Sequence, residues 1–457
     1  MFALPGIIVL IGLTLLRPQE FVPELEGVPL LHIAIVLAIL GLVVDLGTDR
    51  AKLRSTPVTP WALALLGWAA VTLLVASPSE LTTAIQRLLI GVALCLVIAH
   101  GVHTPAALAA IGATILACSL GLAAIGIHQG LSPQQCLVAE ETAGVPTAGV
   151  PDGRSCETRD DCYGTSETVP GATYLCEHVG LFGTTSIDGG RVRYRGELGD
   201  PNELALTLGA ALPLAYVSPR PDRRVRRWLL LLASAALVAI CIALTGSRGG
   251  MLATLAVLLC AFAATGRVRT AVVTALLAIP AIVLASRTGE GASSSTTERL
   301  ESWAAALEMF RGHPVAGVGH AMFTAHHYLT AHNAYLLAAA EMGLVGLFLF
   351  LGLLYASGRI LWSGVRYYDA VGSPPRAWAI ALLAALGGLI VGMFFLSFTY
   401  HHVLWMFMGL CGAYYNVARH ADPDFRVRLR AVDFAAIGGL VLGVLVLLLA
   451  LTRFTPQ

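Results

Sequence analysis

Long apolar runs recur along the whole chain, and no other feature of the sequence constrains the fold as strongly. Most of them are long enough to cross a hydrocarbon layer of about 30 Å as a helix. Hydrophobic residues make up 56% of the 457 residues and charged residues only 12%, whereas a soluble protein of this size needs a charged surface. The sequence therefore predicts an all-α polytopic membrane protein with about 12–13 transmembrane helices. The thirteen runs lie at 2–16, 28–46, 60–76, 83–100, 105–127, 202–218, 228–245, 250–265, 270–286, 333–357, 377–397, 402–418 and 431–452.

The start of the chain argues against a removed signal peptide, and the charge balance argues against a nucleic-acid partner. MFALPGIIVLIGLTLL lacks the basic residues and the small-residue cleavage pattern of a removed signal peptide, so we interpret it as a retained first helix. The formal net charge of +1 gives no broad basic surface, so we expect no nucleic-acid partner.

The distribution of arginine predicts the orientation. The connections after the second, sixth, eighth, tenth and twelfth runs carry most of the loop arginines, and all of them are even-numbered. By the positive-inside rule this side is the cytoplasm. Two connections, 128–201 and 287–332, are much longer than ordinary connectors and fall on the opposite side, where we expect function.

These features divide the chain into five segments. We expect N-terminal transmembrane helices, a loop that contains cysteines, helices joined by a glycine-rich turn, a second long loop with an amphipathic helix, and C-terminal transmembrane helices. The segments are 1–127, 128–201, 202–286, 287–332 and 333–457.

Four of the nine cysteines lie in the first long loop. An even number of cysteines in a loop that faces an oxidising compartment predicts two disulfides, and three pairings are possible. CETRDDC lacks the spacing of a zinc site. The loop cysteines are Cys136, Cys156, Cys162 and Cys176; the others, in apolar runs, are interpreted as buried thiols.

The first polar segment on the expected outer side is RYRGELGDPNELALTLGAALPLA (193–215). Arg193 and Arg195 precede a Gly-Asp-Pro turn, after which Asn202 opens a helix; Asp200 is an alternative cap. A substrate-binding role for these residues and an ordinary basic loop end with a capped helix are equally compatible with the pattern.

The second segment is TGSRGG (245–250), in which a costly arginine stands between two apolar runs. The glycines allow a sharp turn and close approach of a ligand. Arg248 stands at the start of a helix, where free N–H groups favour an anion, and its guanidinium suits a phosphate. An arginine that merely reaches lipid headgroups is the alternative, and the scarcity of arginine on this side weakens it.

The third segment covers 293–350. Ser295 and Glu298 form a capping-box pattern, followed by an amphipathic helix on the membrane that carries Arg299 and ends at Gly312 and Pro314. Next, His332 and Asn333 open a transmembrane helix. We expect His332 and Tyr335 to share one helix face, and Glu341 to lie roughly 13 Å deeper as an intramembrane carboxylate. The five histidines of 313–332 include no metal-binding helical pair, so we expect no metal.

Together TGSRGG, RLESWAAALEMFRGHPVAGVGHAMF and HNAYLLAAAEMGLVGLFLFLGLL resemble the O-antigen ligase superfamily, and GDPNELALTL fits the family's preceding segment. The superfamily includes O-antigen ligases, O-antigen and exopolysaccharide polymerases, and O-linked oligosaccharyltransferases. The resemblance covers about 190–355 and does not extend to the cysteine loop.

The resemblance implies a glycosyltransferase in the bacterial inner membrane with its active site facing the periplasm. Such an enzyme moves a glycan from undecaprenyl diphosphate to an acceptor hydroxyl with inversion, without a metal or cofactor. Carried over to this sequence, it assigns Arg248 and Arg299 to the diphosphate and His332 to the acceptor proton. We expect substrate contacts from Arg193, Arg195, Asn202, Tyr335 and Glu341, and partners among membrane lipids and polysaccharide assembly proteins.

Several functions remain open at this stage. The cysteine loop is unlike the corresponding part of the usual ligase, which slightly favours a polymerase. The alternatives are a ligase that acts on lipid A core and an O-linked oligosaccharyltransferase. A transporter of lipid-linked sugars needs charges deep in several spans and paired broken helices, and only Arg87 and Glu341 lie inside runs. A third possibility is a scaffold whose cysteine loop binds a partner. This function does not explain the presence of Arg248, Arg299 and His332.

Overall fold

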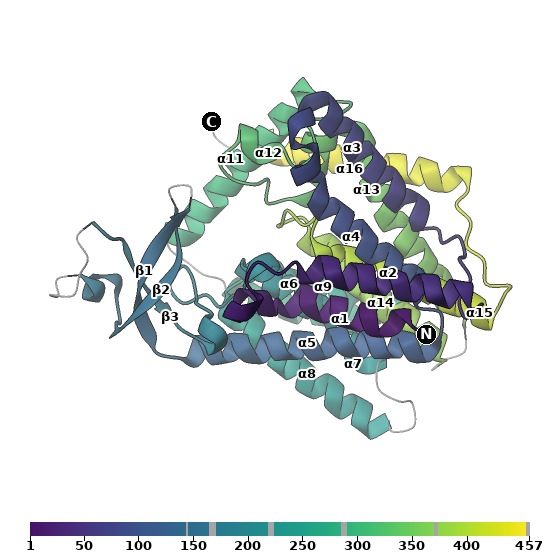
Figure 1. Cartoon of the computed structure of the whole chain (residues 1–457), viewed down its shortest axis with the longest axis horizontal. Coiled ribbons are helices and arrows are strands. Elements are labelled where there is room, and N and C mark those ends of the chain that lie inside the picture. The colour runs from purple at the N-terminus through teal and green to yellow at the C-terminus, as the bar shows by residue number, and fades with distance from the viewer. Residues whose placement is uncertain (143–144, 164–170, 218–223, 285–289, 370–372, 454–457) are drawn as a thin grey trace.

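The computed structural model describes residues 1–142, 145–163, 171–217, 224–284, 290–369 and 373–453, and they form a helical membrane protein with one small sheet (Figure 1). Each predicted apolar run coincides with helix, so the predicted all-α membrane class is confirmed. The helices are α1 Ala3–Leu16, α2 Leu30–Gly47, α3 Thr59–Ala76, α4 Leu81–Gly101, α5 Pro105–Leu131, α6 Pro201–Ala211, α7 Leu214–Val217, α8 Arg224–Thr245, α9 Arg248–Ala264, α10 Val268–Leu284, α11 Glu290–Gly312, α12 Phe323–His326, α13 Ala334–Tyr367, α14 Pro374–Gly392, α15 His402–Ala421 and α16 Ala431–Arg453.

Fewer helices than predicted are clear membrane spans. Within the described residues, nine are long and apolar enough to cross a membrane. The predicted run 202–218 is broken at Pro213 into α6 and α7, because proline lacks the N–H that a helix interior needs. Helices α9 and α10 have 17 residues each, and α15 carries polar residues such as Asn416 and Arg419.

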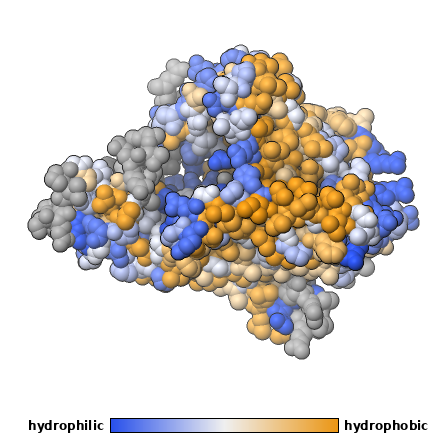
Figure 2. All heavy atoms as spheres, in the orientation of Figure 1, coloured by the Kyte–Doolittle hydropathy of each residue, from blue (hydrophilic) through white to orange (hydrophobic). Residues whose placement is uncertain are grey.

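The surface of the bundle agrees with a lipid environment. Figure 2 shows a broad apolar band between polar ends. Apolar side chains are widely exposed on the helices, among them Val36, Leu40 and Val43 of α2, each of which is more than half exposed. Apolar side chains in water at this density would aggregate, whereas lipid accepts them.

Residues 128–201, predicted as a loop, contain a small sheet that the sequence analysis missed. Its strands are β1 Gln134–Thr142, β2 Val145–Ser155 and β3 Tyr174–His178, in the order β2-β1-β3 with antiparallel pairing. The glycines and prolines of β2 hide the alternation that indicates a strand, and two shifts interrupt its register with β1. The sheet stands at one end of the bundle, beyond α5, and we call this the sheet end (Figure 1).

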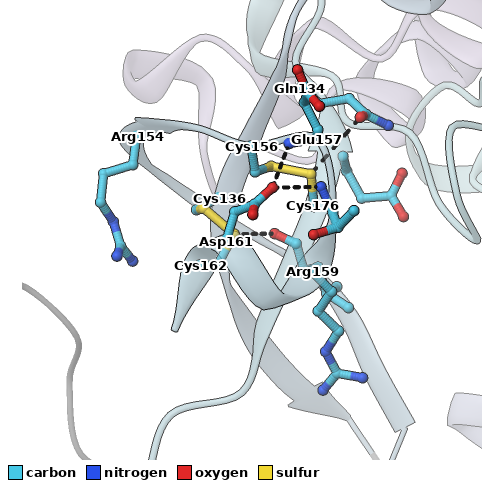
Figure 3. The surroundings of a disulfide bond; sticks show 12 residues. Gln134, Cys136, Arg154, Cys156, Glu157, Arg159, Asp161, Cys162 and Cys176 are labelled. Carbon is cyan, nitrogen blue, oxygen red and sulfur yellow. Dashed lines mark hydrogen bonds between the residues drawn. A yellow bond between two sulfur atoms is a disulfide. The ribbon is translucent and has the colours of Figure 1, made fainter. Parts of the chain in front are cut away.

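Two disulfides hold the sheet, as predicted, and the structure selects one of the three pairings. Cys136 bonds Cys162, and Cys156 bonds Cys176 (Figure 3). Cys136 of β1 faces Cys176 of β3 across the ladder. Each of these two strands therefore carries one cysteine of one bridge. Buried Tyr174 packs against these sulfurs and forms most of the small core. A sheet with so little apolar area depends on such cross-links.

The pairing can be tested by mass spectrometry of non-reduced protein. Cleavage after Arg154, Arg159 and Tyr163 puts each of the four cysteines on a separate peptide. We expect two disulfide-linked pairs of peptides, which contain Cys136 with Cys162 and Cys156 with Cys176. Trypsin alone does not separate Cys162 from Cys176, so the cut after Tyr163 is required. A linked Cys136–Cys176 pair, or free thiols at all four positions, contradicts the structure.

Candidate functional site

Helices α6 and α9 begin side by side near the sheet end, and a hydrogen bond joins their first turns. Asp200, rather than Asn202, caps α6: its carboxylate accepts from the Asn202 backbone N–H at 2.6 Å, so the alternative cap of the sequence analysis is the observed one. The Asn202 side chain is buried, and its Oδ1 accepts from Ser247 Oγ at 2.6 Å. Thus the predicted GDPNE and TGSRGG segments form a single structure.

The TGSRGG turn has the geometry that its glycines predicted. Gly246 has φ +59°, a conformation that favours glycine. Ser247 caps α9 by accepting from the Gly250 N–H at 2.9 Å. At Gly250 a Cβ would collide with Ala205 of α6, so only glycine allows the two helices to approach this closely. Arg248 is the first residue of α9 and its side chain is exposed.

A further arginine, which the sequence analysis did not select, braces this turn. Arg191 Nε donates to the Thr245 carbonyl at 2.9 Å, and the Val192 N–H donates to the Leu244 carbonyl at 3.2 Å. Arg191 also pairs with Asp188 at 3.3 Å. The segment after the sheet therefore returns to the end of α8 and adds a third guanidinium beside the turn.

Arg299 reaches the same place from α11. Its Nη1 donates to the Phe395 carbonyl at 3.1 Å, and Phe395 also lies against Gly249 of the turn. Burial lowers the pKa of Arg299, and the charges of Asp200, Arg191 and Arg248 all act on it. The guanidinium stays charged, because arginine does not deprotonate in proteins.

Helix α11 differs from the predicted amphipathic helix in two respects. It begins at Glu290, before the predicted cap at Ser295, although it ends at Gly312 as expected. It packs on protein rather than lying alone on the membrane. Trp303 is buried against Phe394 at a ring distance of 5.4 Å. This packing fixes the position from which Arg299 points toward the turn.

His332 lies just before α13 rather than inside it. Asn333 is the N-cap, and its Oδ1 accepts from the N–H groups of Tyr335 and Leu336, so the predicted shared helix face of His332 and Tyr335 is wrong. His332 has φ +47°, a strained conformation for a residue with a Cβ. Burial lowers its pKa, and the Arg299 charge lowers it further. The imidazole is therefore neutral at neutral pH and able to accept a proton.

We call Arg191, Arg248, Arg299 and His332 the arginine–histidine cluster. They come from four segments that are far apart in the sequence, three of which meet at Phe394 and Phe395: Arg299 binds the Phe395 carbonyl, Gly249 next to Arg248 lies against Phe395, and Asn333 next to His332 binds the Phe394 carbonyl. A group of guanidinium cations beside a neutral imidazole is suited to binding an anion next to a base.

Three other residues predicted to contact substrate have hydrogen-bond partners within the protein. Arg195 donates to the carbonyls of Glu20, Phe182 and Gly183, at 2.6–2.8 Å. Arg193 Nε donates to the Thr185 carbonyl at 3.1 Å, and the Tyr335 hydroxyl donates to the Ile390 carbonyl at 2.7 Å. Arg193 and Arg195 hold the sheet segment, and Tyr335 is 5% exposed, so these contacts join none of the three side chains to the cluster.

Glu341 accepts two backbone hydrogen bonds from the preceding loop. Its carboxylate accepts from the N–H groups of Ala321 at 2.9 Å and Phe323 at 3.1 Å. The backbone of α13 is kinked at Gly343, with φ +65°, and the loop covers the kink: Gly319 N–H donates to the Glu341 carbonyl at 3.0 Å. The GVGHAMF loop therefore packs against α13 at the level of Glu341.

A polar cavity of about 690 Å³ opens beside this loop. His320 and Glu341 form part of its wall; burial lowers the pKa of His320 to about 4, so its ring is neutral. The His320 ring packs edge-on against Tyr400 at 4.3 Å. Other charged lining residues are Arg17, Arg87 and Glu203.

The cavity adjoins the arginine–histidine cluster through shared segments. Thr330 lines the cavity two residues before His332, and its hydroxyl bonds Ser397 at 2.8 Å. Ser397 also lines the cavity and lies two residues beyond Phe395, whose carbonyl accepts from Arg299. The anion site and the polar cavity are thus two halves of one candidate site.

Glu341→Gln tests the role of the buried carboxylate. The amide can accept one of the two N–H bonds but turns its NH₂ toward the other N–H, so we expect a loss of about 1.5–3 kcal/mol in stability. The measurement is the thermal unfolding midpoint of purified protein. Glu308→Gln, at an exposed position on α11, is the control and is expected to leave the midpoint unchanged. Equal midpoints for wild type and Glu341→Gln would contradict this role.

The described residues offer one group of three potential metal ligands: Cys136, Cys156 and Cys162. All three sulfurs are in disulfides, so no thiolate is present to bind a metal there.

The comparisons with known proteins agree with this geometry. No curated protein matches the chain. The family model described as O-antigen ligase matches residues 206–351, a range that contains Arg248, Arg299, His332 and Glu341. This match, over about a third of the chain, confirms the resemblance to the O-antigen ligase superfamily.

Proposed function

We propose that this protein transfers or polymerises a glycan carried on undecaprenyl diphosphate at the periplasmic face of a bacterial inner membrane. The arginine–histidine cluster carries the proposal, because the charges of Arg191 and Arg248 act on Arg299, and the charge of Arg299 in turn acts on the neutral His332. A polyprenyl diphosphate is a lipid with two anionic phosphates. Its lipid tail fits the apolar belt and its diphosphate fits the arginines.

The reaction is a direct displacement at the anomeric carbon. The acceptor hydroxyl gives its proton to His332, and its oxygen forms a bond to the anomeric carbon. The bond between that carbon and the diphosphate oxygen breaks, and the electron pair leaves with the diphosphate. Arg248 and Arg299 stabilise the charge that develops on this leaving group, and no metal is needed for that purpose. A single displacement inverts the anomeric configuration.

The polar cavity is the proposed acceptor side of the site. Its mixture of neutral imidazole, carboxylate and hydroxyl groups suits a sugar, which offers both donors and acceptors. Glycan acceptors fit both a polymerase, which extends a lipid-linked repeat, and a ligase, which uses lipid A core. We favour the polymerase because the sheet with its two disulfides is a folded feature that lies outside the residues matched by the O-antigen ligase family model.

Purified protein in nanodiscs tests the proposal. With undecaprenyl-diphosphate glycan alone, a polymerase produces a ladder of longer glycans, whereas a ligase produces a conjugate only after lipid A core is added. We expect the ladder, and the same rate with and without EDTA. Loss of transfer in EDTA with recovery in magnesium or zinc would overturn the metal-free mechanism. Transport of intact donor without bond cleavage would overturn the enzyme assignment.

A further inference from the structure

A second pocket lies at the end of the bundle opposite the sheet end. It has a volume of about 570 Å³ and is formed where α3 begins, where α15 ends and where the connection 422–430 leads into α16. Figure 1 shows this connection and the sheet at opposite ends of the molecule. The pocket shares no lining residue with the polar cavity described above.

The inner wall of this pocket is aromatic. Trp61 of α3 lies between Phe348 of α13 and Phe434 of α16, with both ring distances at 5.7 Å. Trp61 is fixed in place, since it fills the space beside Gly352 that a Cβ would occupy. Phe434 is 46% exposed, so the wall opens outward between α3 and α16, where lipid would lie. An apolar wall of this kind suits hydrocarbon rather than a charged solute.

The lining of the pocket also contains two arginines and no carboxylate. Arg419, on the last turn of α15, lies over the Tyr415 ring at 5.9 Å, and its buried Nε has no hydrogen-bond partner among the described residues. Arg428 lies on the connection and is exposed. The nearby Asp433 is already bound by Arg359, at 3.4 Å, and by the Arg430 N–H. No carboxylate among the lining residues balances the positive charge of the pocket.

We propose that this pocket binds the headgroup of one anionic phospholipid, with the phosphate between Arg419 and Arg428 and the start of an acyl chain along the Trp61–Phe434 wall. Two guanidinium groups match the oxygens of a phosphate diester. Arginines at a membrane surface attract anionic lipid, and an aromatic wall next to them accepts the chain. The site is independent of glycan transfer.

Native mass spectrometry of the purified full-length protein, with phosphatidylglycerol or phosphatidylcholine added, tests the proposal. We expect one phosphatidylglycerol to bind with a preference of roughly thirtyfold over phosphatidylcholine, the effect of two arginines near one anionic headgroup. Arg419→Gln with Arg428→Gln should abolish the preference. Arg426→Gln is the matched control, because Arg426 lies on the same exposed connection but does not line the pocket.

Two further measurements separate a lipid site from a charge effect. Ala64→Trp fills the pocket and keeps both arginines, so it should also abolish tight binding. Glycerol 3-phosphate carries the headgroup phosphate without chains, and we expect it not to displace the lipid. An equal loss with Arg426→Gln, displacement by glycerol 3-phosphate at the lipid's own concentration, or no headgroup preference in the wild type would each overturn the proposal.

Discussion

His332→Ala is expected to lower the single-turnover rate of glycan transfer by about 10²–10⁴ while the protein still binds the polyprenyl-diphosphate donor. On the proposed mechanism, His332 accepts the acceptor proton and the arginines hold the donor. Burial and the Arg299 charge lower the pKa of His332, which keeps the imidazole in the neutral form that a base requires. The measurement is donor affinity together with the transfer rate in nanodiscs.

The backbone at His332 calls for a second variant. With φ +47°, alanine at this position adds strain, whereas asparagine tolerates the left-handed conformation and has no basic nitrogen. We expect His332→Asn to lose transfer like His332→Ala while keeping the wild-type unfolding midpoint. His313→Ala, at an exposed position after α11, is the control. Normal transfer by His332→Asn would move the role of base to His327, His326 or Glu341.

The pH dependence follows from the direction of the same shift. A base works only when deprotonated, so a lowered pKa keeps His332 active below the usual histidine value of about 6.5. The rate should therefore fall only when the pH drops below that value. Arg299→Gln removes a neighbouring positive charge, which raises the pKa of His332 and moves the acid limb of the profile to higher pH. An acid limb that does not move would show that Arg299 does not influence the base.

The sequence predicts the helical membrane class and the main members of the cluster because both leave local signals. Apolar runs mark the helices and a costly arginine marks Arg248, whereas Arg299 was assigned by the superfamily resemblance. The superfamily resemblance adds His332, and the match over residues 206–351 confirms that resemblance. The structure then brings these three residues together, although no local pattern places them in contact.

The remaining features depend on tertiary contacts that the sequence does not display. Arg191 and Arg195 lie close together in a basic stretch, yet one braces the TGSRGG turn and the other ties the sheet segment to Glu20. The sheet was missed because the glycines and prolines of β2 hide its alternation, because its register with β1 is irregular, and because cross-links contribute much of its stability. The kink at Gly343, which allows the loop to reach Glu341, lies inside the predicted run 333–357, which the sequence presents as a single helix.

Arg248→Lys is expected to fail to restore what Arg248→Ala removes, with both variants lowering transfer by about 10²–10³ and weakening donor binding. Arg248 is exposed at the first turn of α9, with the capped helix start behind it and the charges of Arg191 and Arg299 close by. A diphosphate placed there meets several positive charges. The loss of one charge alone therefore leaves the site positive. Lysine keeps the charge but offers a single ammonium, whereas the planar guanidinium binds two phosphate oxygens at once.

The comparison of lysine with alanine therefore separates geometry from charge. Arg299→Lys is expected to behave in the same way, because Arg299 also holds the Phe395 carbonyl and lysine cannot keep that bond and reach a phosphate together. Arg311→Lys, at an exposed position near the end of α11, is the matched control and should retain full transfer. The measurements are polymer or conjugate formed, donor affinity, and protein level by blot. Full activity of Arg248→Lys would show that the site needs only positive charge, and the proposed two-oxygen grip on the diphosphate would then be wrong.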